Sequence, residues 1–173
     1  SPHAAGKSAI FLVAIGKDDA EMAVIEMGAN HIGEIASYCA YALPTHGLIT
    51  NCGKAHLEGF GSIEGVRKGK GELFDYLRTL DKASAFVMWD YDYLQEMSKG
   101  ISSIIKYGTH DTDTEGNVLQ SDPFLEVAFT KGISLPSIRT QLVGDYNLSN
   151  VLAAVTVGKY FNIAEEKIKI AIE

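Results

Sequence analysis

The chain has 173 residues, of which 46% are hydrophobic and 21% charged, with a formal net charge of -7. This composition is that of a globular protein with one full core, and the negative charge argues against general nucleic-acid binding. No apolar run approaches the roughly 20 residues that span a bilayer, no signal peptide is apparent, and Cys39 and Cys52 are typical of buried thiols in a reducing, cytoplasmic compartment.

The first hundred residues alternate short apolar runs with amphipathic segments. Residues 9–15 are apolar and fit either a helix end or a strand. The segments expected after them are a buried strand over 22–25, a helix over 34–42, a strand over 46–50, a helix from Ser62 through Leu77, a strand over 83–88, a short helix over 91–99 and a strand over 101–107. This alternation predicts an α/β fold with a mostly parallel sheet flanked by helices, in which strands 22–25 and 46–50 lie side by side.

From His110 onward the sequence has a different pattern. Residues 110–117 are polar and predict a turn. Short alternating runs follow at 118–120, 124–130 and 137–142, which predict a small antiparallel meander attached to the sheet. Two helices should complete the chain, one capped by Asn147 and running through Tyr160, the other over 164–172.

The first two predicted strands both end in polar side chains. Glu26-Met-Gly-Ala-Asn30-His31 follows the first strand, and Asn51 and the segment Gly53-Lys-Ala-His56 follow the second. Strand ends of an open α/β sheet are where ligands usually bind. A carboxylate directly after a buried strand is costly unless it is paired or binds a cation, so Glu26 is a candidate ligand; the alternative is a structural hydrogen bond to a nearby loop.

His56 and Lys70 are the candidate companions of Glu26. His56 lies in a glycine-rich loop that would allow a ligand close approach, and neutral imidazole binds metals, although a lone histidine is often only structural. Lys70 lies between Gly69 and Gly71 inside a predicted helix, where each glycine costs about 1 kcal/mol against alanine, so a ligand or a packed backbone must favour small residues there.

Two further segments have the composition of nucleotide sites. Gly6-Lys7-Ser8 resembles the end of a phosphate-binding loop, but Ser1 stands where the first glycine belongs, so an accidental match is the simpler interpretation. Asn147 and Asn150 are three residues apart at a helix start and share a face. They could act as caps, or the second amide could read the edge of a base.

Taken together, these segments resemble the central domain of the Mur ligase family. The resemblance covers residues 20–173 and is greatest to the branch that adds D-alanyl-D-alanine. The segments that carry it are Glu26-Met-Gly-Ala-Asn-His, Thr50-Asn51, Gly53-Lys-Ala-His-Leu-Glu-Gly-Phe-Gly-Ser62, Lys70-Gly-Glu and Gly144-x-x-Asn147-x-x-Asn150-x-x-Ala153-Ala154.

The resemblance implies a P-loop NTPase-like fold and an ATP-dependent carboxylate–amine ligase that works in peptidoglycan precursor synthesis. ATP would phosphorylate a UDP-linked muropeptide, and D-alanyl-D-alanine would attack the acyl phosphate, with Mg²⁺ and positioning dominating catalysis. The implied roles are magnesium binding and catalysis for Glu26, His56 and a carbamylated Lys70, nucleotide binding for Asn51, Asn147 and Asn150, and phosphate or muropeptide binding for Asn30 and His31. A monomer is expected.

The sequence departs from the family pattern. The complete phosphate-binding loop that the family has before the Glu-Met-Gly segment is absent or altered, and Tyr146 stands where the family usually has histidine. We expect a single central domain over 1–173, trimmed at its N-terminus, without the UDP-binding and C-terminal domains and inactive alone. The alternatives are another amide ligase of the superfamily, of the folylpolyglutamate or cyanophycin synthetase kind, a non-catalytic nucleotide-binding module, or a fragment that binds nothing.

Overall fold

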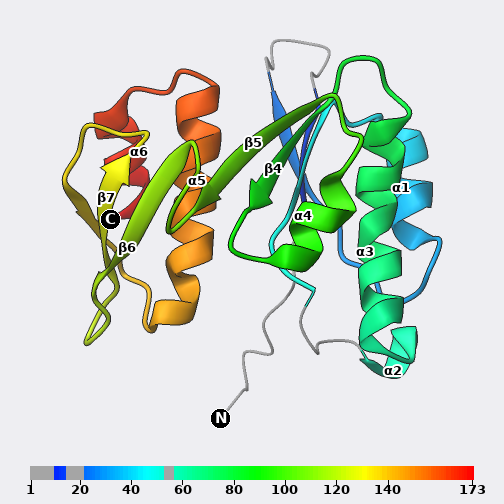
Figure 1. Ribbon diagram of the computed structural model, residues 1–173, viewed down its shortest axis with the longest axis horizontal. Helices are drawn as coiled ribbons and strands as arrows, with labels where there is room; N and C mark the ends of the chain where they lie inside the picture. The colour runs from blue at the N-terminus through cyan, green and yellow to red at the C-terminus, as the bar shows by residue number, and fades with distance from the viewer. Residues whose placement is uncertain (1–9, 15–21, 53–56) are drawn as a thin grey trace. The chain divides into compact units, whose positions relative to one another are not determined.

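The computed structural model describes residues 10–14, 22–52 and 57–173 (Figure 1). The chain divides into two compact units, one of residues 1–87 and 93–104 and one of residues 88–92 and 105–173. Helices and strands alternate in the first unit, and a meander precedes two helices in the second, which confirms the predicted α/β class. Within the described ranges, every helix is too short or too polar to cross a lipid bilayer.

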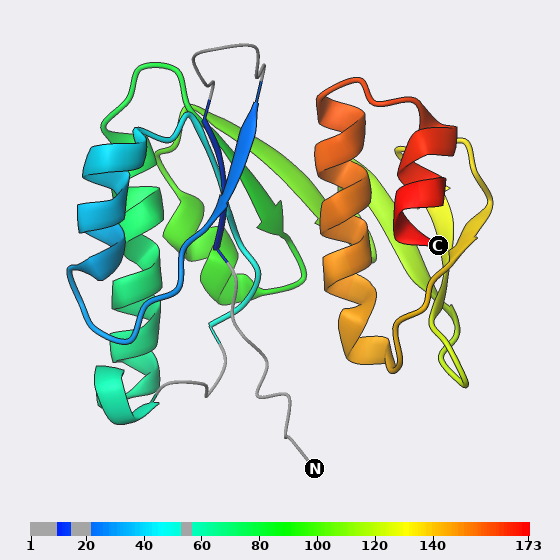
Figure 2. The same ribbon diagram turned by 180° about the vertical axis from the view of Figure 1, so that it is seen from behind.

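The elements of the first unit follow the predicted order closely. They are β1 (Ile10–Ala14), β2 (Ala23–Glu26), α1 (Glu34–Ala42), β3 (His46–Ile49), α2 (Leu57–Phe60), α3 (Ile63–Arg78), most of β4 (Ser84–Met88), most of α4 (Asp92–Ser98) and the start of β5 (Ser103–Gly108). Only the short helix α2 was not predicted. Helices α1 and α3 lie side by side, as both views show (Figures 1 and 2).

The strand pairing of this unit differs from expectation at one edge. β3 and β4 are parallel, with His46 opposite Ser84, as the β–α alternation predicts. β1 pairs antiparallel with both β2 and β3, so it separates these two strands, and the prediction that they are adjacent is wrong. Because both are antiparallel to β1, β2 and β3 still run in the same direction.

The prediction that residues 22–25 form a buried strand is also wrong. β2 is the edge strand of the described sheet, and Val24 is 64% exposed. An apolar run of this length cannot by itself distinguish an edge strand from a central one. By contrast, every residue of β4 is buried, as expected for a strand in the interior of a sheet.

Helix α3 packs against β3. Ser62 caps it as predicted, accepting a hydrogen bond at its Oγ from the Gly65 N–H at 3.0 Å. Its buried residues recur at three- and four-residue intervals, the spacing of one helix face. These residues are Val66, Gly69, Lys70, Leu73, Phe74 and Leu77. Lys70 therefore occupies a position on this face where the pattern calls for an apolar side chain.

The two glycines beside Lys70 have different neighbours. A Cβ on Gly69 would lie 2.3 Å from the ring of Phe60 and one on Gly71 would lie 3.3 Å from the methyl group of Met97. Packing against the ring of Phe60 therefore accounts for Gly69 without a ligand.

These neighbours predict opposite effects of alanine. Gly69→Ala should lower the free energy of unfolding by about 1–2 kcal/mol, because overpacking outweighs the gain in helix propensity. Gly71→Ala, the matched control on the same helix, should be neutral or stabilising by up to about 1 kcal/mol, because the flexible Met97 side chain can move aside. Urea unfolding of both variants measures the difference, and equal effects would contradict this account of α3.

The second unit contains the end of β5, β6 (Thr114–Gln120), β7 (Glu126–Lys131), β8 (Ser137–Arg139), the 3₁₀ turn η1 (Asp145–Asn147), α5 (Leu148–Tyr160) and α6 (Glu165–Ile172). β6, β7 and β8 form the predicted antiparallel meander, and β6 is parallel to the end of β5. β6 begins at Thr114, so the prediction of a turn over 110–117 is wrong in its second half, where Thr114 and Gly116 are buried.

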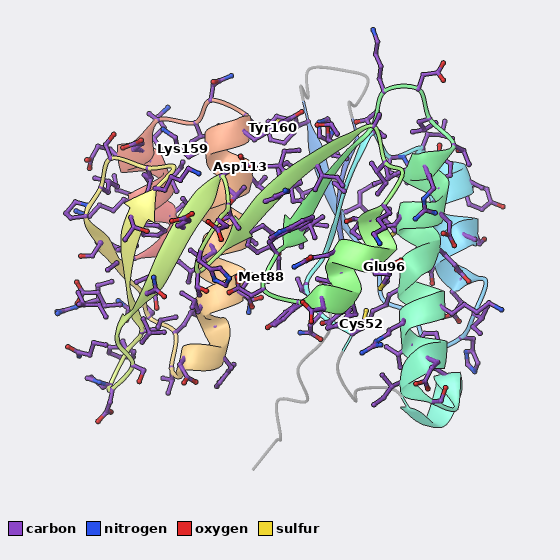
Figure 3. All side chains as sticks on the ribbon, in the orientation of Figure 1. Cys52, Met88, Glu96, Asp113, Lys159 and Tyr160 are labelled. Atoms are coloured by element: carbon purple, nitrogen blue, oxygen red, sulfur yellow. The ribbon has the colours of Figure 1, made fainter. Side chains whose placement is uncertain are left out.

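Helices α5 and α6 lie beside each other in this unit (Figure 2). α5 packs against β6, where a Cβ on Gly116 would lie 2.9 Å from a methyl group of Leu152. An ion pair between Lys159, labelled in Figure 3, and Glu165 joins the two helices, with 2.5 Å between Nζ and Oε1. The Glu165 carboxylate also accepts the Ser134 N–H, at 3.1 Å from Oε2, which ties the loop after β7 to α6.

Candidate functional site

Lys70 is the buried charged residue among the described residues of the first unit. Its side chain is on the core face of α3, the residue is 3% exposed, and Nζ donates to the carbonyl oxygen of Asn51 at 2.6 Å. Burial lowers the pKa of Lys70 below its ordinary value, because the ammonium loses its hydration. The structure therefore brings two predicted site residues, Lys70 and Asn51, into contact where the chain leaves β3.

Cys52 adjoins this contact. Figure 3 shows it in the space between α3 and α4, and its N–H donates to the Tyr93 hydroxyl of α4 at 3.1 Å. Burial raises the pKa of the Cys52 thiol to about 11, against the opposing influence of the Lys70 and Arg67 cations. The Arg67 guanidinium lies 4.7 Å above the Tyr93 ring, a cation–π arrangement. Lys70 and Arg67 therefore give the end of β3 a positive character.

Cys39 and Cys52 are both buried free thiols, as predicted. Burial also raises the pKa of Cys39 to about 11, with a smaller contribution from the negative charge of Glu72. Both thiols are therefore protonated at neutral pH and unreactive in the folded chain.

Glu26 ends β2, and its side chain is exposed. Among the described residues its carboxylate makes no hydrogen bond or ion pair. The expected desolvation penalty is therefore absent, because β2 is an edge strand. Glu26 also lines a pocket of about 320 Å³ between the end of β2 and α1, together with Met27, Tyr38 and Tyr41.

Asn30 and His31 lie in the loop between β2 and α1. Both of their N–H groups donate to Oε2 of Glu34, at 2.7 and 3.1 Å, and these bonds hold the pKa of Glu34 below its ordinary value. His31 Nδ1 lies 3.4 Å from Oε1 of the same carboxylate. The imidazole itself is exposed, with 69% of its side chain accessible.

This loop is also held from α2 and α3. A Cβ on Gly59 would lie 2.2 Å from the carbonyl oxygen of Asn30, so α2 touches the loop closely. Glu72 of α3 accepts hydrogen bonds from the N–H groups of Gly33 and Ala36, at 2.6 and 2.9 Å. The loop after β2 thus contacts both the helix that carries Lys70 and the segment that follows residue 56.

Asn147 and Asn150 meet in the second unit. Asn150 Nδ2 donates to Oδ1 of Asn147 at 3.0 Å, which confirms that they share a helix face. Asn147 occupies the predicted N-cap position of α5, but its side chain makes no capping bond to the helix. Its Nδ2 donates instead to the carbonyl of Val143, at 3.0 Å, because Asn147 belongs to the turn η1. Tyr146 beside it is 76% exposed.

Two predictions fall outside the described residues: His56 as a metal ligand, and Gly6-Lys7-Ser8 as an accidental match to the end of a phosphate-binding loop. Within the described ranges, no three His, Cys, Asp or Glu side chains gather to hold a metal ion. The chemistry of Glu26 still fits Mg²⁺, because a carboxylate at a strand end supplies the hard oxygen ligand that this ion takes. The three-residue magnesium site remains a prediction.

Glu34, Glu72, Arg67 and Tyr93 join the candidate site although sequence reasoning assigned them no role. Glu72 follows Lys70 by two residues. The sequence indicates that α1 needs a partner of this kind, because Gly33, the residue before the helix, has no side chain that could cap it. A helix without a local cap needs partners for its N–H groups from elsewhere in the fold. The partner itself cannot be read from the sequence.

The sequence matches the family described as the Mur ligase middle domain over residues 7–158. It is 31% identical to the UDP-N-acetylmuramoyl-tripeptide–D-alanyl-D-alanine ligase of Bacillus subtilis over 149 residues. That alignment covers 86% of this chain and 32% of the relative, so the chain spans about a third of the relative's length.

Solved structures agree with the sequence match. A crystal structure of MurF from Acinetobacter baumannii aligns with a TM-score of 0.74 at 25% identity, covering 85% of this chain and 32% of that one. A crystal structure of MurF ligase from Thermotoga maritima in complex with ADP aligns with a TM-score of 0.71 at 21% identity, covering 85% of this chain and 35% of that one. From the match over 7–158 and the agreement in fold, the chain belongs to the Mur ligase middle domain family.

Proposed function

We propose that this chain is the ATP-binding central domain of an amide ligase that adds D-alanyl-D-alanine to a UDP-linked muropeptide. The proposal takes its substrates from the name of its curated relative and its nucleotide from the ADP complex of a structural relative. The observation that carries it is Lys70, a buried cation bonded to the main chain at the end of β3. A core position given to a charge costs stability, and such sites are usually functional.

The reaction that this implies has two steps. The muropeptide carboxylate attacks the γ-phosphorus of ATP, which gives an acyl phosphate and ADP. The amine of D-alanyl-D-alanine then attacks the acyl carbon, so that phosphate leaves and an amide forms. Both steps concentrate negative charge on oxygens, which positioned cations stabilise. Arg67 and Lys70 are the described cations next to Cys52, and Tyr93 holds Arg67 in place.

Glu26, with His56, would hold Mg²⁺, which when bound neutralises charge on the phosphoryl oxygens. As an ammonium, Lys70 would repel a nearby Mg²⁺. As a carbamate, Lys70 would instead offer this ion a negatively charged oxygen ligand. Carbamate forms when the neutral amine attacks CO₂ and loses a proton. Because burial lowers the pKa of Lys70, the neutral amine is more available than in an exposed lysine.

Asn30 and His31 would contact the phosphates or the muropeptide, since both are exposed in the loop that begins at Glu26. Asn51 would bind near the phosphates through its side chain, while its carbonyl accepts from Lys70. Asn147 and Asn150, joined through their amides, would contact the adenine base. We place the chain in a cytoplasmic ligase that acts as a monomer.

The test is Mg²⁺-dependent ATP binding measured by calorimetry on the 173-residue chain. Glu26→Gln should weaken binding at least about tenfold, since even outer-shell partners of a metal are worth that much. Stability should change by less than about 0.5 kcal/mol, because Glu26 is exposed. Glu96→Gln, an exposed glutamate of α4 labelled in Figure 3, is the matched control and should bind as the wild type does.

Binding that is equally strong in Glu26→Gln would contradict the magnesium role and favour the non-catalytic nucleotide-binding module. No binding by the wild-type chain, in a sample whose folding is verified by circular dichroism, would contradict the proposed function of this chain.

A further inference from the structure

Helix α1 begins without a cap of its own. Its N-cap residue is Gly33, at φ 96°, which has no side chain to bond the free N–H groups of the first turn. Those groups are bonded from another helix: the Glu72 carboxylate of α3 accepts from Gly33 at 2.6 Å and from Ala36 at 2.9 Å. A carboxylate is the favoured charge at this end of a helix.

A second carboxylate holds the residues just before it. Glu34 accepts the N–H groups of Asn30 and His31. Four N–H groups between residues 30 and 36 are thus bonded by Glu34 and Glu72. These four main-chain donors are therefore occupied by carboxylates of the protein itself and are not available to a phosphate.

Glu72 also shares a turn of α3 with Lys70. Lys70 bonds the carbonyl of Asn51, where the chain leaves β3, and Glu72 bonds the start of α1, where the loop after β2 ends. Glu26 stands at the other end of that loop. One turn of α3 therefore links the segment that follows β3 to the far end of the loop that follows β2, although β1 lies between these two strands in the sheet.

We propose that Glu72 is a positioning residue that fixes the loop from Glu26 to Gly33 against the helix turn bearing Lys70, and so sets the affinity of the site for Mg²⁺. This inference rests on the proposed function, since it requires that Glu26 and Lys70 serve one magnesium site. Glu72 itself binds main-chain N–H groups and touches neither nucleotide nor metal.

The test compares Glu72→Gln with Asp75→Asn in the 173-residue chain. Glutamine keeps one acceptor oxygen but loses the charge and presents an amide to a second N–H donor, so it breaks one of the two bonds. Asp75 is on the same helix, its side chain is 69% exposed, and its ion-pair partner among the described residues is Arg78, one turn away, so its variant controls for charge removal from α3.

Two measurements are needed. Amide hydrogen exchange by NMR should be about tenfold faster in Glu72→Gln at whichever of Gly33 and Ala36 faces the amide nitrogen, because that N–H loses its acceptor. Titration of Mg²⁺ at fixed ATP should show about tenfold weaker Mg²⁺ affinity in Glu72→Gln. ATP affinity without metal should be unchanged, and this contrast distinguishes positioning from a general loss of structure.

The outcomes separate this inference from the proposed function. If the wild type binds ATP with Mg²⁺ and Glu72→Gln has the same Mg²⁺ affinity, the positioning role is overturned while the proposed function stands. If the wild type shows no Mg²⁺-dependent binding, both proposals fail, and exchange at Gly33 and Ala36 still decides whether Glu72 holds these two N–H groups. Should Glu72→Gln not fold, Glu72→Asp, which keeps the charge on a shorter side chain, is tested against the same two expectations.

Discussion

Methionine in place of Lys70 is expected to stabilise the chain and to weaken its Mg²⁺-dependent binding of ATP. Lys70 is 3% exposed and its ammonium has lost its hydration, whereas methionine fills a similar volume without a charge. The free energy of unfolding should rise by about 1–2 kcal/mol, within the range for replacing buried charges by apolar groups. Mg²⁺-dependent ATP binding should fall at least about tenfold, as for other residues that support a metal site.

Lys68→Met is the matched control for this substitution. Lys68 is exposed on the same helix, so its stability change should stay within about 0.5 kcal/mol and binding should be unaffected. Urea unfolding and calorimetry on the two variants give both quantities. A less stable Lys70→Met would show that the hydrogen bond to Asn51 outweighs the cost of burying the charge, and would remove the stability argument for a functional lysine.

Alanine at Gly59 is expected to displace the loop after β2. The new Cβ would lie 2.2 Å from the Asn30 carbonyl oxygen and 3.1 Å from its carbon, and these are main-chain atoms that cannot rotate away. We expect a loss of about 1–3 kcal/mol in the free energy of unfolding, the usual cost of overpacking. Mg²⁺-dependent ATP affinity should fall as well, because Asn30 and Glu26 belong to the displaced loop.

Gly28→Ala provides the comparison, because a Cβ at Gly28 would meet no atom within 4 Å. Gly28 lies in the loop after β2 that Gly59→Ala is expected to displace, and Gly28→Ala should leave stability and binding close to those of the wild type. Thermal unfolding and calorimetry on both variants measure the contrast. If Gly59→Ala retained wild-type affinity for ATP and Mg²⁺, the contact between α2 and the loop would have no part in binding.

Local sequence pattern was sufficient for most elements of this fold. α1 spans the predicted residues 34–42 and α3 begins after Ser62, because a helical apolar period and, for α3, a capping serine are local signals. The position of β1 between β2 and β3 is a long-range choice that residues 10–14 do not encode by themselves. The same limit applies to β2, whose apolar run is equally compatible with an edge and an interior strand.

For the candidate site, the sequence predicted which residues take part better than it predicted their burial and their hydrogen-bond partners. Glu26 is a candidate because a carboxylate after a buried strand is costly, yet Glu26 is exposed and the buried charge among the described residues is Lys70. The sequence did contain a signal for this, since Lys70 interrupts the apolar face formed by Val66, Leu73 and Leu77. Glu72 could not be assigned in advance, because its partners at Gly33 and Ala36 are distant in sequence and lie in the main chain.

The exposed edge of the sheet has a practical consequence for handling this chain. β2 pairs on one side only among the described strands, and Val24 presents an apolar side chain to water beside it. Unpaired main-chain groups of this kind are templates onto which another extended segment can add, and natural sheets often protect them with lysine or proline. Preparations of the chain should therefore self-associate as they are concentrated, and a lysine at Val24 is the simplest way to keep them dispersed.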